Sequence, residues 1–206
     1  MRESLTVVTP PAIEPVTVGE AKAYARIDTA DDDALIEALI TAARTAAEEY
    51  TRRSFVARTL KLTLDLPCSG LSAGLSEGVY DLPVSALYGS FPSTIRLPAP
   101  PLLSITSVVT HDTANAATTL ASSHYFADTA GGRLVFNDTA VLPSNLRPFA
   151  ACEITYTAGY GATASAVPQP IRTAVLMHAQ RMYDERVVCE MPPSCHQLLR
   201  QYRVYG

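Results

Sequence analysis

The spacing of apolar residues changes twice along this chain, and that change limits the folds it can adopt. From Asp32 to Tyr50 apolar residues recur every three or four positions, which is the period of a helix. From Thr59 to Leu66 leucine occupies every second position, which is the period of a strand with one buried face. After Pro170 the helical spacing returns. The chain is therefore predicted to be α+β, with a helical framework and an inserted antiparallel β unit.

Four parts are expected. They are an N-terminal helical part (1–53), an inserted β-rich part (54–160), a C-terminal helix packing on the N-terminal helices (161–191), and a C-terminal arm (192–206).

Two helices are predicted in the first part. Thr17 and Glu20 have the spacing of a capping box, which opens a helix through Arg26. The acidic residues from Asp28 to Asp33 can cap the next helix, predicted over 32–50. Its apolar face is expected to hold Leu35, Ile36, Leu39, Ala43, Ala46, Ala47 and Tyr50, with Arg44 and Glu48 mainly on the other side.

The last helix is predicted over 170–187. Its inner stripe is expected to hold Ile171, Ala174, Val175, His178, Met182 and Tyr183. Pro192 and Pro193 break the chain. Ser194 can then cap a short helix over 196–200.

The β-rich part begins at the alternating strand, which Pro67 ends. A loop rich in Ser and Gly is expected from Cys68 to Gly78. Asp128–Gly132 is typical of a hairpin loop. Further strands are predicted over 94–97, 105–110, 124–127, 133–136 and 152–157.

Composition excludes several function classes. The net charge is −4, so no overall field for binding nucleic acid exists. No apolar run reaches the roughly 20 residues of a membrane span, and the start has no signal-peptide pattern, so a soluble protein made in the cytoplasm is expected. Only 17% of residues are charged, which favours partners covering part of the surface.

Candidate catalytic and metal-binding residues are few and scattered. Cys189, Cys195 and His196 match no standard zinc spacing. Asp31–Asp33 is interpreted as a helix start rather than a cation site, and His178 as a core residue. A base and a nucleophile could in principle come from His111, Asp112, Ser122, Ser123 and His124, but these lie in polar connections. No catalytic residue, metal or cofactor is predicted.

Arginines and tyrosines alternate near the C-terminus, from Arg200 to Tyr205. Such residues could contact nucleic acid. The favoured interpretation is an arm that projects and anchors in a groove of a partner protein, because Arg and Tyr dominate binding hot spots.

Several segments, in order, resemble phage head–tail connector proteins. They are Thr9–Pro11, Pro15–Lys22, Ala25–Asp28, Asp32–Ile36, Tyr50–Arg53, Leu97–Val108, Ile154–Tyr160, Val167–Arg172 and Leu198–Arg203.

The resemblance implies a structural head–tail adaptor of a tailed phage, prophage or gene transfer agent. Such proteins form a ring, commonly of twelve copies, beneath the portal protein, and bind a stopper or tail-terminator protein next. Double-stranded DNA passes through the ring without sequence-specific binding. The implied location is the neck of the particle, with no cofactor, no catalysis and no membrane.

Two surfaces are expected to make the contacts. Portal docking is assigned to Leu198, Leu199, Arg200, Tyr202, Arg203 and Tyr205. Contacts between subunits are assigned to Leu35, Leu39, Ala43, Ala46, Tyr50, Ile171, Val175 and Met182.

Two other functions stay open at this stage. One is a monomeric β module that binds a carbohydrate or peptide ligand. The other is a hydrolase with its site in the β-rich part, pairing His111 or His124 with a nucleophile.

Overall fold

The computed structural model describes residues 2–66, 92–137, 145–186 and 190–205. The chain divides into two compact units, and the mixed α+β class is confirmed. The β unit comprises Met1–Thr9, Thr59–Pro98 and Ser104–Thr157. The helical unit comprises Pro10–Arg58, Ala99–Leu103 and Ala158–Gly206. The expected loop over Cys68–Gly78 lies outside the described residues.

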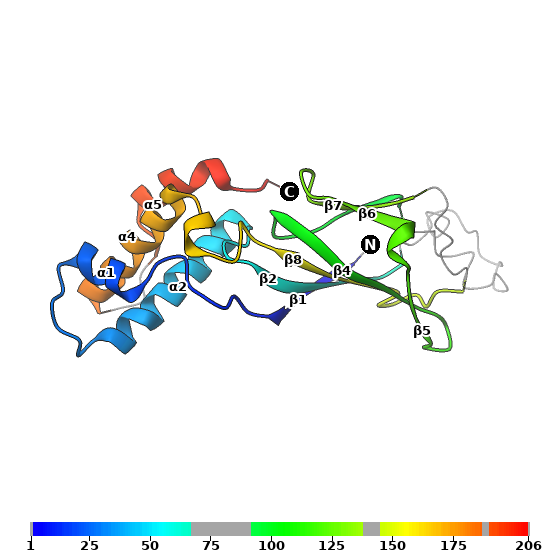
Figure 1. Cartoon of the computed structure of the whole chain (residues 1–206), viewed down its shortest axis with the longest axis horizontal. Coiled ribbons are helices and arrows are strands. Elements are labelled where there is room, and N and C mark those ends of the chain that lie inside the picture. Colours follow the sequence, from blue (N-terminus) through cyan, green and yellow to red (C-terminus); the bar gives the residue numbers. More distant parts are fainter. Residues whose placement is uncertain (1, 67–91, 138–144, 187–189, 206) are drawn as a thin grey trace, which may run out of the picture. The chain divides into compact units, whose positions relative to one another are not determined.

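The helical unit contains the helices predicted from the apolar spacing (Figure 1). Its elements are α1 (Val18–Ala25), α2 (Asp33–Thr51), α4 (Gln169–Glu185), α5 (Pro193–Leu199) and the 3-10 helices η3 (Ala164–Ala166) and η4 (Arg200–Tyr202). None of the helices in the described ranges is long and apolar enough to cross a membrane.

The start of α1 confirms the capping box. The backbone N–H of Glu20 donates to the Thr17 hydroxyl at 3.1 Å, and the backbone N–H of Thr17 donates to the Glu20 carboxylate at 2.9 Å. Of the two other predicted caps, the one before α2 is confirmed in position only, and the one at Ser194 is wrong. Asp32 is the N-cap of α2, but its side chain makes no capping hydrogen bond. Ser194 lies inside the first turn of α5, because Pro193 already occupies the first helical position.

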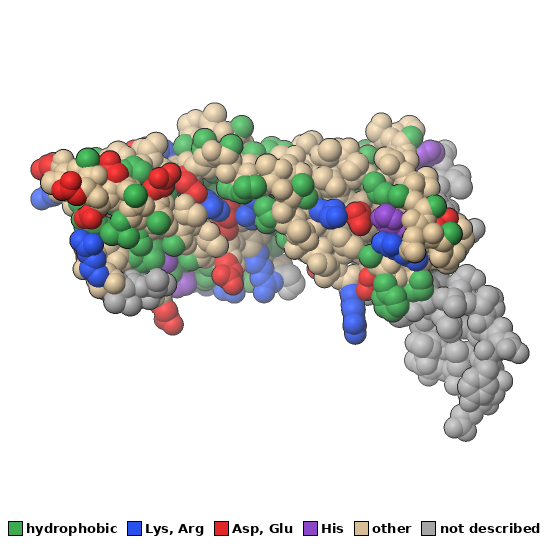
Figure 2. Space-filling view, turned by 90° about the horizontal axis from the view of Figure 1, so that it is seen from below, with side chains coloured by type: hydrophobic (Ala, Val, Ile, Leu, Met, Phe, Trp, Pro, Cys, Tyr) green, Lys and Arg blue, Asp and Glu red, His purple; other side chains and the backbone are tan. Residues whose placement is uncertain are grey.

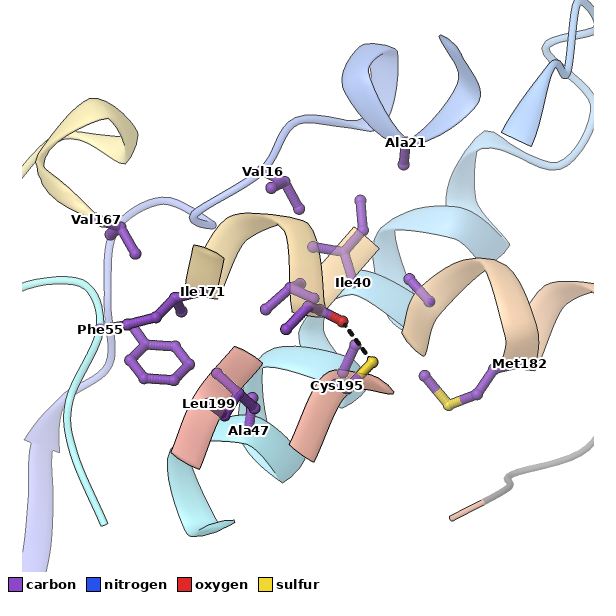
Figure 3. Packing of buried hydrophobic residues seen from close by; sticks show 14 of the residues in the cluster. Val16, Ala21, Ile40, Ala47, Phe55, Val167, Ile171, Met182, Cys195 and Leu199 are labelled. Atoms are coloured by element: carbon purple, nitrogen blue, oxygen red, sulfur yellow. Dashed lines mark hydrogen bonds between the residues drawn. The ribbon is translucent and has the colours of Figure 1, made fainter. Parts of the chain in front are cut away.

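The core of the helical unit forms where α1, α2, α4 and α5 meet (Figure 3). It contains the predicted stripe of α4, which includes Ile171 and Val175, both fully buried. The buried face of α2 is rotated from the expected one, because Leu35 is 38% exposed whereas Arg44 and Glu48 are buried. Apolar spacing alone placed those two charged residues toward solvent, and their mutual pairing allows the burial.

The β unit contains two antiparallel sheets, with strand orders β1-β2-β8-β4-β5 and β3-β7-β6 (Figure 1). Their strands are β1 (Glu3–Thr9), β2 (Arg58–Leu64), β3 (Thr94–Arg96), β4 (Leu102–His111), β5 (Ala117–Thr119), β6 (Tyr125–Asp128), β7 (Arg133–Phe136) and β8 (Cys152–Ala158). The short helix η2 (Ser122–His124) precedes β6.

The alternating pattern of β2 is confirmed, since Leu60, Leu62 and Leu64 are fully buried. The hairpin between β6 and β7 has its loop at the predicted Asp128–Gly132. Two strands were not predicted from the sequence, β5 and β1. The first nine residues were expected to belong to the helical part, but β1 pairs with β2, although residues 10–57 separate the two strands.

Candidate docking surface

The C-terminal segment is fixed to the helical unit by buried residues of α5. Leu199 and Cys195 are fully buried, and the Cys195 thiol donates to the backbone oxygen of Ala174 in α4 at 3.4 Å (Figure 3). The expectation of a projecting arm is therefore wrong for this chain. Pro192 and Pro193 do end one helix and start another, but the new helix turns back onto α4 and α2.

The residues after α5 are tied to the end of α2. The backbone N–H of Val204 donates to the carbonyl of Thr51 at 2.9 Å, and the Arg53 guanidinium donates to the carbonyl of Tyr202 at 2.5 Å. The C-terminal segment takes part in both bonds through its main chain, as the donor at Val204 and as the acceptor at Tyr202. The path of the segment is thus fixed while its side chains stay available.

Aromatic and basic side chains gather at this end of α2. The rings of Tyr50 and His196 meet edge to face, with centroids 4.5 Å apart. The guanidinium of Arg203 lies 4.9 Å from the Tyr50 ring centroid and 5.6 Å from that of Tyr205. An open groove lies beside them, lined by Ala46, Glu49, Tyr50, Glu190, Met191 and His196.

The six residues assigned to portal docking divide by exposure. Arg200, Arg203 and Tyr205 are exposed, with Tyr205 at 67%. Leu198 and Tyr202 are half-buried, whereas Leu199 belongs to the core. A partner can therefore reach five of these side chains without unfolding the segment.

The residues assigned to subunit contacts divide in the same way. Four of them are buried within the helical unit itself: Ala43, Ile171, Val175 and Met182. The other four keep exposed surface, and these are Leu35, Leu39, Ala46 and Tyr50. Leu39 also lines a small apolar crevice between α1, α2 and α4, together with Ile27, Ile36, Leu176 and Tyr183.

A buried ion-pair network holds α2 to the chain that follows it. Glu48 accepts from Arg44 at 2.7 Å, from Arg58 at 3.1 Å, and from the backbone N–H of Phe55 at 2.8 Å. Arg44 also donates to Glu14 at 2.7 Å. Burial alone would lower the pKa of Arg44, but the two carboxylates raise it above its ordinary value. The Arg44 guanidinium therefore stays charged despite its burial.

The acidic residues before α2 make ordinary surface contacts. Asp33 pairs with Lys22 at 2.7 Å, and Asp32 accepts from the Tyr183 hydroxyl. That bond raises the pKa of Tyr183. Across the described ranges, no three His, Cys, Asp or Glu residues gather as metal ligands. On the face in Figure 2, acidic and basic side chains are interspersed rather than gathered into a patch of one sign.

The residues considered for catalysis lie at two places in the β unit, with His111 and Asp112 at the end of β4 and Ser122, Ser123 and His124 in η2. His111 is in β4, with its Nε2 3.5 Å from a Glu153 oxygen. Asp112 accepts from the backbone N–H groups of Ala114 and Ala116, which shapes a turn. Within the described part of the chain, no hydrogen bond joins His111 or His124 to Ser122 or Ser123.

A comparison with protein families matches residues 15–129 to the phage gp6-like head-tail connector proteins. This match covers more than half of the chain. The chain belongs to this family. The role of such a protein is structural, as the sequence resemblance implied.

Solved structures similar to this connector come from gene transfer agent (GTA) particles. A chain from the neck of an empty GTA particle, computed with C6 symmetry, is 25% identical with a TM-score of 0.73, over 98% of the connector and 96% of that chain. A chain from the virion of a native GTA particle is 23% identical with a TM-score of 0.71, over 98% and 96%.

A third chain, from the neck of a native GTA particle computed with C12 symmetry, is 23% identical. Its TM-score is 0.67, over 100% of the connector and 97% of that chain. These likenesses extend over both units, beyond the segment that the family comparison matches. No curated protein gives a significant match.

Sequence reasoning missed two buried features of the connector's helical unit. One is the ion-pair network of Glu48, for which the spacing of Arg44 and Glu48, one helical turn apart, was an available signal. The other is the return of α5 to the core. The available signal there was the spacing of Cys195 and Leu199. These two apolar residues are four positions apart, so they share one face of a helix.

Proposed function

We propose that this connector forms a closed ring of twelve copies in the neck of a phage or gene transfer agent particle. The ring lies beneath the portal protein, continues the DNA channel and receives a stopper or tail-terminator protein. The observation that carries the proposal is the family match, supported by similarity over nearly the whole chain to neck chains solved with cyclic symmetry.

The net negative charge of the chain is consistent with a channel that does not bind the DNA passing through it. The chain has 20 acidic and 16 basic residues, so each subunit brings net negative charge to the ring. A protein that neutralises many phosphates releases counterions and holds DNA, whereas an acidic wall does not. Double-stranded DNA would therefore slide through without sequence-specific binding. The proposal includes no catalytic step.

The portal contact is assigned to the exposed side chains of the C-terminal segment. Arg200, Arg203 and Tyr205 present two charges and one ring from a fixed backbone. A fixed backbone lowers the entropy lost on docking, and truncating such anchors typically costs ~2 kcal/mol or more. The subunit contact is assigned to the exposed part of α2, with Leu35, Leu39, Ala46 and Tyr50.

The test compares two variants of the full chain in purified particles. Tyr205→Ala combined with Arg200→Ala is expected to leave the thermal unfolding temperature unchanged and to reduce the connector retained on portal-bearing heads at least tenfold. The loss recurs at every copy in a ring, so a modest defect is multiplied. Gln197→Ala changes an exposed residue of the preceding helix α5 and serves as the control.

Mass measurement of the unmodified particles is expected to give twelve copies of the chain. Isolated single copies in the particle would overturn the ring. Retention of the double variant at the level of the control would place the portal contact elsewhere.

A further inference from the structure

The strand β1 carries apolar side chains that the described chain leaves about half exposed. All seven of its residues are exposed, including Leu5 at 43%, Val7 at 49% and Val8 at 53%. It stands at one end of the larger sheet, so among the described residues only β2 pairs with it, on one side. The described residues therefore leave both its outer edge and much of its apolar side-chain surface open to a partner.

The apolar face of β2 continues onto β1. Leu5 is opposite Leu62 and Val7 is opposite Leu60, and directly opposed residues share a face of the sheet. Leu60 and Leu62 are fully buried, whereas their partners on β1 are close to half exposed. The apolar face of the sheet thus includes both β2 and β1, but it is buried on β2 and partly exposed on β1.

The backbone of β1 presents unpaired groups on its outer side. The N–H of Asp65 donates to the carbonyl of Arg2 at 3.1 Å, which makes this pair a hydrogen-bonded one. Hydrogen-bonded and non-bonded pairs alternate along an antiparallel ladder. In the observed register, Ser4 and Thr6 therefore point their N–H and C=O groups at β2, and Leu5 and Val7 point theirs outward.

The edge has little of the protection that free edges usually carry. Lysines, prolines, short length or a bulge normally prevent edge-to-edge pairing. β1 is seven residues long, has neither Lys nor Pro, carries one charge at Glu3, and shifts register only beyond Val7. Its sequence, rich in Thr and Val, is that of an interior strand.

The same sheet has a second open edge at its other end. β5 pairs with β4 only at Val109–His111, so along 104–107 the described residues pair with β4 on its β8 side alone. Ser104 and Thr106 are exposed there, and the stretch carries no charge. It is therefore free of repulsion toward the nearly uncharged β1.

We infer that β1 of one subunit adds to the open edge of β4, along 104–107, in the next copy of this chain, so that the sheet continues between subunits. Pairing two different edges of one sheet is a head-to-tail contact, which repeats and can close into a ring, whereas β1 pairing with itself would stop at a dimer. The inference rests on the proposed ring, and it adds a second contact to the one assigned to the helices.

A disulfide cross-link tests the pairing directly. Leu5→Cys and Thr106→Cys are introduced together in the full chain, with a second chain carrying Leu5→Cys and Ser104→Cys to cover the neighbouring register. Leu5 shares a face with buried Leu62, and Thr106 shares one with buried Val108. Within one subunit two strands separate β1 from β4, about 14 Å at the usual spacing, which exceeds the roughly 7 Å limit for a disulfide.

Oxidised particles are expected to give a ladder of covalent multiples of the chain on a non-reducing gel. Each single-cysteine variant is the control and is expected to give no ladder. Absence of the ladder in particles that contain the ring, or cross-linking of Leu5→Cys to a different protein, would overturn the inference and leave the ring itself standing.

A backbone variant provides the second measurement. Leu5→Pro removes an outward N–H without touching the hydrogen bonds to β2, and Leu5→Thr keeps the N–H while removing the apolar side chain. Incorporation into the neck is expected to fall at least tenfold for Leu5→Pro, and much less for Leu5→Thr. Incorporation of a folded Leu5→Pro chain at the unmodified level contradicts the inference. Absence of the unmodified chain from the neck would instead contradict the proposed function.

Discussion

At the scale of single residues, Glu48 shows how much one side chain can organise. It is 5% exposed and accepts from two arginines and from the backbone of Phe55, so it joins α2 to the chain leading into β2. A buried pair of this kind adds little net stability compared with apolar residues, but removing one partner leaves charge uncompensated.

Glu48→Ala is accordingly expected to lower the free energy of unfolding by about 3 kcal/mol. It removes a carboxylate that pairs with Arg44 and Arg58, and it leaves the backbone N–H of Phe55 without its hydrogen-bond acceptor. Glu49→Ala, at the neighbouring exposed position, is the matched control and is expected to change it by less than about 0.5 kcal/mol. Urea unfolding of the purified chain measures both. Equal effects would show that the network does not hold α2 in place.

At the scale of elements, the capping box at the start of α1 makes the stability of the helical unit depend on pH. The backbone N–H of Thr17 chiefly lowers the pKa of Glu20, with the Arg172 guanidinium adding to the effect. A carboxyl whose folded pKa is lowered stabilises the fold above its ordinary pKa of 4.5, and that stabilisation is lost as pH falls through the lower folded value.

The unfolding temperature of the unmodified chain is therefore expected to fall below about pH 4.5 more steeply than that of Glu20→Gln. Thr17→Ala is expected to cost about 1 kcal/mol at neutral pH, because it removes the capping oxygen. Thr29→Ala, exposed and outside the helices, is the control. Parallel pH curves for the unmodified chain and Glu20→Gln would exclude the capping box as a source of acid sensitivity.

At the scale of the whole molecule, the family match indicates a protein that works as a structural part of an assembly. The His and Ser side chains considered for a hydrolase do not hydrogen-bond to one another in the described part of the β unit. The C-terminal segment brings Arg203 and Tyr50 together, and the larger sheet ends in the open strand β1. Both are features typical of surfaces that bind other proteins.

Replacing His111, His124, Ser122 and Ser123 singly by Ala is expected to leave particle assembly and DNA transfer intact. Transfer assays and the amount of connector in purified particles check this together. Loss of transfer by a variant that folds and enters particles normally would revive a catalytic role.

Local features of this protein were predictable because they depend on near neighbours in the sequence. The capping box of Thr17 and Glu20, the alternation of Leu60, Leu62 and Leu64, and the hairpin at Asp128–Gly132 each require only a few adjacent residues. The order of several short segments along the chain indicated the connector family, and the family match over residues 15–129 confirms it.

The tertiary structure alone decided which faces meet. Whether Arg44 and Glu48 are buried depends on Glu14 and Arg58, which lie elsewhere in the chain. Whether Leu199 anchors a partner or its own core depends on α4, and whether Glu3–Thr9 is a strand depends on β2. Such choices are set by the free energy of contacts between segments distant in sequence, and neither local spacing nor composition contains those contacts.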